Sequence, residues 1–201
     1  MNFLLFKNEL KGRKIFSLND IRKIDPEFNK VQLNRWSKKN YIKRIKQGFY
    51  MFEDQNINRE FLFLTANKIY WPSYVSLERA LRFYDLIPEE IFQITSVSTK
   101  KTINFDTQVG NFNYRHISTG LFWGYRLKNN FLMAEPEKAI LDYLYLSSHI
   151  NRESDFLEMR INKDSFDQHI DMSKLQAYLG AFKNNLLSER IKILLKTIKN
   201  A

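Results

Sequence analysis

Apolar residues recur at helical spacing in three short stretches over the first forty residues of the chain. The first stretch covers residues 3–10, and the second follows Ser17, whose hydroxyl can accept a hydrogen bond from a free backbone amide in the first turn. Asp25-Pro26 ends the second helix, because the residue before a proline disfavours the α conformation. A third helix is predicted from Asn29 to about Lys39.

A β-hairpin is predicted directly after the third helix. Residues 41–45 and 49–52 have the composition of strands, and Lys46-Gln47-Gly48 supplies a tight turn between them. Residues 14–16 form a short extended piece between the first two helices. This order of elements is typical of a winged helix-turn-helix, so we predict such a DNA-binding domain at residues 1–54.

The rest of the chain has a mixed pattern that predicts a second domain. Residues 54–58 are polar and indicate a linker, and the predicted domain covers residues 59–201. We expect helices at 59–69, 77–84, 135–148 and twice between 173 and 199, and strands at 91–99, 102–106, 112–118 and 131–134. The predicted fold class is α+β, in which the winged helix-turn-helix precedes a mixed α/β domain with a small sheet and C-terminal helices.

Positive charge is concentrated in the first quarter of the chain. Residues 1–52 contain 13 Lys and Arg but only 4 Asp and Glu, which gives +9 of the total formal charge of +10. Residues 53–201 are close to neutral. A basic segment joined to a nearly neutral one indicates that the basic segment binds a polyanion, here double-stranded DNA.

The third predicted helix has one face suited to reading DNA. If Leu33 and Trp36 point inward, a face with cations, an amide and one small apolar group points outward. Arg and Asn form bidentate pairs with base edges, Val contacts the thymine methyl, and Lys contacts phosphate. Together with the cations of the hairpin, the predicted DNA-binding residues are Val31, Asn34, Arg35, Lys38, Lys39, Lys43, Arg44, Lys46 and Gln47.

The sequence lacks the usual signatures of enzymes and metal proteins. It contains no cysteine, and its three histidines are scattered without metal-ligand spacing, so we expect no metal and no cofactor. A restriction-type nuclease motif fails because Pro136 stands two residues before Lys138. No signal peptide or membrane-spanning run is evident, so we expect a cytoplasmic protein. No catalytic motif occurs either, so we expect no catalytic residues.

Three segments resemble the AbiEi antitoxins of type IV, abortive-infection toxin–antitoxin systems. The first is L-x-x-W-x-x-x-N-Y-I-x-R-I-x-x-G-F-Y at 33–50, the second is YVSLERAL at 74–81, and the third is AEPEKAILD at 134–142. The segment LEMRI at 157–161 is similar to a family segment that precedes the C-terminal helices. Arg79 replaces a common Ser and Asn40 a common Gly of the family. The motif residues are Ser76, Ala80, Leu81, Pro136, Glu137, Lys138 and Asp142.

The resemblance implies a repressor that binds repeats in its own promoter and counteracts a nucleotidyltransferase-like toxin, without a need to bind that toxin directly. Two other classes remain open. One is a winged-helix regulator unrelated to toxins, whose second domain binds a ligand or forms oligomers. The other is a nucleic-acid enzyme that the basic domain delivers to its substrate.

The motif residues also have plain structural interpretations. Ser76 is expected to cap a helix, and Ala80 and Leu81 to lie in the core. Glu135 and Glu137 near a helix start suit the helix dipole. Lys138 and Asp142 are four residues apart on one helix and can form an ordinary ion pair worth a few tenths of a kcal/mol, on the order of 0.3.

Overall fold

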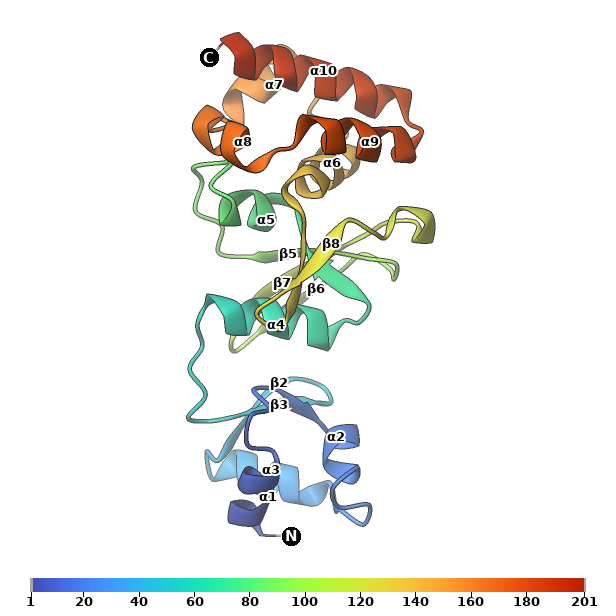
Figure 1. Cartoon of the computed structure of the whole chain (residues 1–201). Helices are drawn as coiled ribbons and strands as arrows, with labels where there is room; N and C mark the ends of the chain where they lie inside the picture. Colours follow the sequence, from blue (N-terminus) through green and yellow to red (C-terminus); the bar gives the residue numbers. More distant parts are fainter. Residues whose placement is uncertain (1, 201) are drawn as a thin grey trace.

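Two clusters of buried hydrophobic residues organise this α+β chain, which a computed structural model describes over residues 2–200 (Figure 1). The smaller cluster lies within the first 52 residues, which we call the head, and the larger cluster lies mainly in the remainder, which we call the body. The head and the body lie one above the other in Figure 1, with the N-terminus at one end and the C-terminus at the other.

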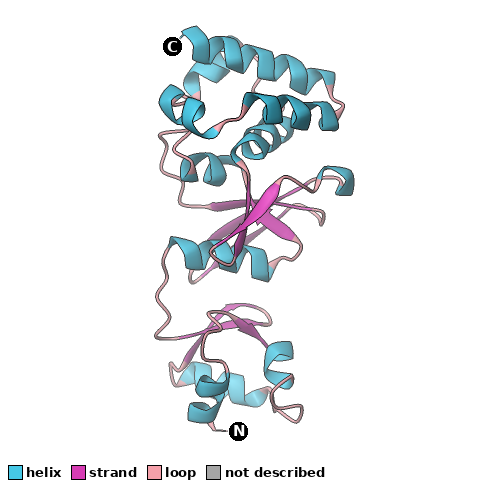
Figure 2. Cartoon of the chain, viewed as in Figure 1, coloured by secondary structure: helices cyan, strands magenta, loops and turns pink. Residues whose placement is uncertain are grey.

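Three helices and a three-stranded antiparallel sheet make up the head (Figure 2). The strand order is β1-β3-β2, and β2 and β3 form a hairpin. The elements are α1 (Phe3–Glu9), β1 (Phe16–Ser17), α2 (Leu18–Arg22), α3 (Val31–Lys38), β2 (Ile42–Lys46) and β3 (Phe49–Phe52).

Capping side chains and an aromatic core explain why the short helices of the head form. Ser17 caps α2 as predicted, in a capping box with Asp20. Phe6 of α1 is fully buried, and its ring centroid lies 4.5 Å from that of Trp36 and 5.3 Å from that of Phe16. Tertiary packing of these rings stabilises helices that are too short to be stable alone.

The body is built on a six-stranded mixed sheet in the order β6-β7-β5-β4-β9-β8. The β5–β7 and β4–β9 pairs are parallel, and the other neighbours are antiparallel. The strands are β4 (Ser73–Val75), β5 (Ile94–Ser98), β6 (Ile103–Thr107), β7 (Gly110–His116), β8 (Tyr125–Lys128) and β9 (Phe131–Ala134).

Helices cover both faces of this sheet. Figures 1 and 2 show α4 on the side of the sheet toward the head, and the later helices beyond the opposite side. The helices are α4 (Arg59–Ile69), α5 (Leu77–Phe83), η1 (Thr119–Leu121), α6 (Pro136–Leu146), α7 (Glu153–Glu158), α8 (Lys163–His169), α9 (Met172–Phe182) and α10 (Asn185–Asn200). No helix within residues 2–200 has the length and apolar content needed to cross a membrane.

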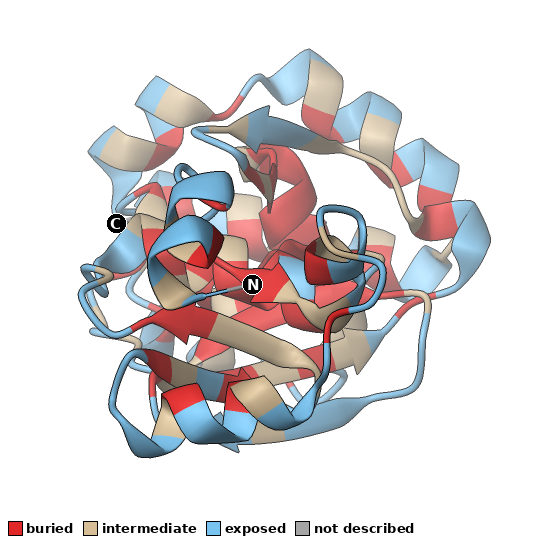
Figure 3. Cartoon of the chain, turned by 90° about the horizontal axis from the view of Figure 1, so that it is seen from below, coloured by how far each residue is buried: buried red, intermediate tan, exposed pale blue. Residues whose placement is uncertain are grey.

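The head packs against the body through the inner face of its sheet. Ile15, Ile45 and Met51 are buried and belong to the larger hydrophobic cluster of the body. Figure 1 places the hairpin between the helices of the head and α4. In the view from the head end, buried segments lie toward the middle of the molecule and exposed segments toward its rim (Figure 3).

Several predicted boundaries differ from the structure for local reasons. The second predicted helix ends at Arg22, before the predicted stop at Asp25-Pro26, because the amides of Ile24 and Asp25 both bond to the carbonyl of Ile21 in a tight turn. The third helix begins at Val31, two residues late, and its first amide donates to the side chain of Asn29 at 3.0 Å.

The helix predicted over 59–69 and the strand predicted over 131–134 are confirmed at the residue level. The break between the two C-terminal helices covers Lys183 and Asn184, and the backbone of Lys183 is left-handed with φ of 49°. The sequence prediction omitted the strands β4 and β8 and the helices α7 and α8.

Candidate nucleic-acid interface and a buried polar cluster

The outer face of α3 carries exposed side chains of the kinds that contact DNA. Leu33 and Trp36 are 3% and 5% exposed, which confirms the predicted inward face. The outward residues Val31, Asn34, Arg35, Lys38 and Lys39 are all exposed. The side chains on this face are therefore accessible to a large ligand.

Most cations of this face have no acidic partner. Within residues 2–200, Lys43 pairs with Glu53 at 2.7 Å, whereas Arg35, Lys38, Lys39 and Arg44 form no ion pair. Unpaired cations leave a positive surface potential, which attracts a polyanion.

Two of the predicted DNA-binding residues of the hairpin are exposed, whereas a third contacts the body. Gln47 at the turn and Arg44 on β2 are exposed, and Gly48 has a φ of +86° that suits glycine in the tight turn. Lys46 instead points toward the body: its Nζ donates to the carbonyl of Ile69 at 3.1 Å and lies 3.6 Å from the ring centroid of Phe105.

These contacts correct the expectation that Lys46 is a free cation on the hairpin. Burial and the charge of Lys100 lower the pKa of Lys46 below its ordinary value. Its stem and ammonium hold the hairpin against α4 and β6. We therefore leave Lys46 out of the set of residues proposed below to contact DNA.

The motif residues of the body meet in a polar cluster that is closed off from solvent, and we call Tyr74, Ser76, Lys138 and Asp142 the buried cluster. Lys138 and Asp142 are ion-paired, and both side chains are 0% exposed. The hydroxyls of Tyr74 and Ser76 each donate to Oδ2 of Asp142 at 2.9 Å. Nζ of Lys138 also donates to the Tyr74 hydroxyl at 2.9 Å.

Aromatic rings and a glycine enclose the ammonium of Lys138. Its Nζ lies 5.0 Å from the ring centroid of Trp123 and 5.1 Å from that of Phe182. A Cβ at Gly124, whose φ is +72°, would lie 2.9 Å from Cγ of Lys138, so only glycine fits against this side chain.

Burial disfavours the charged forms of Lys138 and Asp142, whereas the attraction between the two charges favours them. Burial lowers the pKa of Lys138 and raises that of Asp142, while each charge and its hydrogen bonds shift the other back. Burial and the nearby Asp142 also raise the pKa of Tyr74 well above its ordinary value, so its hydroxyl stays protonated and can donate. The cluster links β4, the start of α5 and α6.

Two structural interpretations of the motif residues hold only in part. Ser76 occupies the position before α5, but its hydroxyl makes no cap bond and binds Asp142 instead. The Lys138–Asp142 pair forms as predicted, but in the core and not as an ordinary surface pair. The burial of Ala80 and Leu81 and the place of Pro136 in the first turn of α6 are confirmed.

Glu135 and Glu137, at the start of α6, both contact residues of α9. Glu135 makes no cap bond; it contacts Arg126, Lys174 and Tyr178. Glu137 accepts from the amide of Asp171 at 3.0 Å, and its Oε2 lies 3.2 Å from Nζ of Lys174. The predicted explanation by the helix dipole alone is therefore incomplete, because these carboxylates join α6 to α9.

Glu135 predicts a specific pH dependence of stability. Burial alone would raise its pKa, but hydrogen bonds from Tyr178 and Lys174 and the charge of Arg126 outweigh burial and place the pKa below the ordinary value of 4.5. Its contribution is therefore complete above that ordinary value and is lost as the pH falls through the lowered pKa. Urea unfolding of wild type and Glu135→Gln is expected to show a difference at pH 7 that shrinks on acidification below about pH 4.5. Glu189→Gln is the control, and a pH-independent difference would contradict the prediction.

The residues that complete the surroundings of the buried cluster were not identifiable from the sequence. Tyr74 lay inside a quoted motif without a role, and Trp123 and Phe182 carried no signal, because their proximity to Lys138 depends on the fold. The four-residue spacing of Lys138 and Asp142 was the one available clue. Within residues 2–200, no group of His, Cys, Asp or Glu is arranged to hold a metal ion.

Comparison of this chain with protein-family models and with curated proteins finds no match.

Proposed function

We propose that the head is a winged helix-turn-helix that binds double-stranded DNA, and that the chain is a transcriptional repressor of its own operon. The observation that carries this proposal is the exposed face of α3, where Arg35, Lys38 and Lys39 lie beside Asn34 and form no ion pair within residues 2–200. The order helix, strand, helix, helix, strand, strand and the charge of +9 in residues 1–52 support it.

In this proposal α3 enters the major groove, where Arg35 and Asn34 contact base edges and Val31 contacts a thymine methyl. Lys38, Lys39, Lys43, Arg44 and Gln47 lie toward the phosphates. The antitoxin role, directed against a nucleotidyltransferase-like toxin, rests on the resemblance of residues 33–50, 74–81 and 134–142 to AbiEi antitoxins.

Binding of the full chain to the DNA upstream of its own coding sequence tests the first part. Fluorescence anisotropy is expected to give an affinity at least 10³-fold higher than for a scrambled duplex at the same salt concentration. Equal affinity for both duplexes would reject a specific repressor, and no binding to either would reject a DNA-binding head.

The antitoxin role has a separate test in living cells. Expression of a neighbouring nucleotidyltransferase-like gene is expected to arrest growth, and coexpression of this chain to restore it. Restoration should persist in a variant that has lost DNA binding, because the body is proposed to act against the toxin. Failure of restoration would favour a winged-helix regulator unrelated to toxins, a class that the cavity described below also favours.

Arg44 and Lys46 form a matched pair for testing the hairpin. Arg44→Ala is expected to weaken binding to all sequences and to reduce the slope of log K against log salt by about one unit, since one phosphate contact is lost. Lys46→Ala is expected to leave the slope unchanged, because its Nζ already binds the body. Salt titrations of the two variants measure this, and an equal loss of slope would return Lys46 to the DNA interface.

A further inference from the structure

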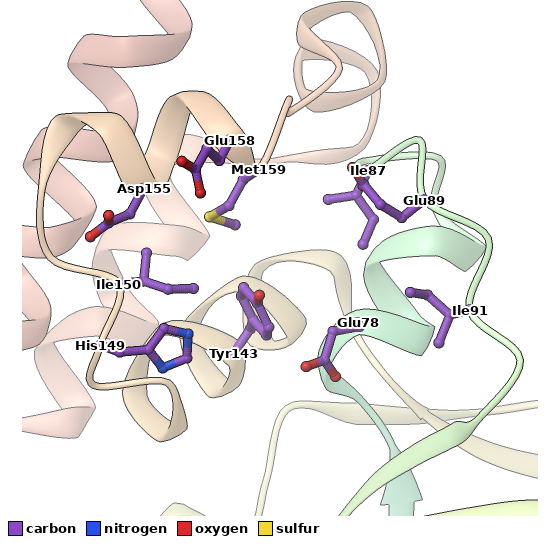
Figure 4. A pocket seen from close by; sticks show the side chains of 10 residues that line it. All are labelled: Glu78, Ile87, Glu89, Ile91, Tyr143, His149, Ile150, Asp155, Glu158 and Met159. Carbon is purple, nitrogen blue, oxygen red and sulfur yellow. The ribbon is translucent and has the colours of Figure 1, made fainter.

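A cavity of about 320 Å³ opens in the body between α5, the segment that follows it, and the chain from the end of α6 through α7 (Figure 4). This volume is within the range of small-molecule sites. The residues that line it are Glu78, Ile87, Glu89, Ile91, Tyr143, His149, Ile150, Asp155, Glu158 and Met159. None of these is a lysine or an arginine, although the chain as a whole is strongly basic.

The four carboxylates of the cavity differ in how far they are neutralised. Glu89 is paired with Arg160, and Asp155 accepts hydrogen bonds from two backbone amides at 2.8 and 2.9 Å. Within residues 2–200, Glu78 and Glu158 have no ion-pair partner. The cavity therefore keeps unneutralised negative charge beside an apolar wall formed by isoleucines and Met159.

Glu78 is the feature that points to a ligand. Its Oε2 is closed off from solvent and has no hydrogen-bond partner among the described residues. An unpartnered carboxylate oxygen is costly to the folded protein, and a cation bound beside the partly exposed carboxylate of Glu78 would offset part of that cost. Figure 4 shows Glu78 and Tyr143 among the side chains that line the same cavity. Burial, together with the charges of Glu78 and Glu89, raises the pKa of Tyr143 to about 12. The Tyr143 hydroxyl therefore remains neutral.

We propose that this cavity binds a small organic cation, an ammonium or guanidinium group on a short apolar stem. Glu78 is its ionic partner, the ring of Tyr143 lies beside the charge, and the isoleucines contact the stem. Within residues 2–200 the acidic groups are not arranged to hold a metal ion, which favours an organic cation over a bare one. This proposal does not depend on the binding of DNA by the head.

Calorimetric titration of the full chain with agmatine and with spermidine tests the proposal. At least one of the two is expected to bind with one-to-one stoichiometry and to raise the melting temperature. Glu78→Gln is expected to weaken that binding at least tenfold and to remove the ligand-induced rise. Without ligand this variant is expected to melt close to wild type, because among residues 2–200 Glu78 makes no ion pair that the substitution would break.

Glu189→Gln is the matched control, since it makes the same change at an exposed position on α10. It is expected to leave binding unchanged. Tyr143→Phe, which keeps the ring, is expected to bind within threefold of wild type, and Tyr143→Leu to bind more weakly. Equal weakening by Glu78→Gln and Glu189→Gln would show general attraction to acidic surface and overturn the proposal, as would the absence of binding of both cations.

Discussion

Asp142→Ala is expected to lower the free energy of unfolding of the full chain by about 3–5 kcal/mol. The substitution removes the anion that neutralises Lys138, which is 0% exposed and lies where water cannot solvate it. It also removes the acceptor for the hydroxyls of Tyr74 and Ser76. Urea denaturation, followed by far-UV circular dichroism, measures the change.

Two further variants separate the charge from the packing. Lys138→Met combined with Asp142→Leu removes both charges and leaves only the two hydroxyls without an acceptor, so it is expected to be more stable than Asp142→Ala alone. Glu189→Ala breaks the exposed Lys192–Glu189 pair and is expected to cost less than about 1 kcal/mol. A cost for Asp142→Ala as small as that of Glu189→Ala would show that the buried cluster does not stabilise the body.

Properties that depend on local periodicity were predictable from sequence. The inward face of α3 follows from the spacing of Leu33 and Trp36, and α4 follows from its apolar pattern between the linker and Trp71-Pro72. The strand β4 has only three residues, too few for an alternating pattern to stand out, whereas the four-residue β9 was predicted from its apolar run.

Properties that depend on contacts between distant segments were not predictable. Lys46 has the sequence of an exposed turn cation, but the ring of Phe105, from a strand nearly sixty residues later, covers it. Lys138 and Asp142 have the spacing of a surface pair, and only the positions of β4, Trp123 and Phe182 show that the pair is buried. Charge and spacing in a sequence do not reveal which distant side chains the fold packs against a given cation or ion pair.

Arg35→Ala is expected to lose about 1–3 kcal/mol of binding free energy on the specific duplex and little on a scrambled one. The guanidinium is exposed on α3 and has no ion-pair partner in the described part of the chain, so it can make a bidentate contact with a base edge. The loss corresponds to about 5- to 150-fold in Kd, measured by anisotropy at constant salt. The melting temperature is expected to be unchanged, because no packing is removed.

Lys39→Ala is the matched control, since it removes one exposed cation that lies just beyond the end of α3. It is expected to weaken both duplexes alike and to flatten the salt slope, as the loss of a phosphate contact does. If Arg35→Ala also weakened both duplexes equally, Arg35 would contact only phosphate, and base recognition would have to come from Asn34 and Val31. If it weakened neither duplex, the outer face of α3 would not be the DNA-binding face.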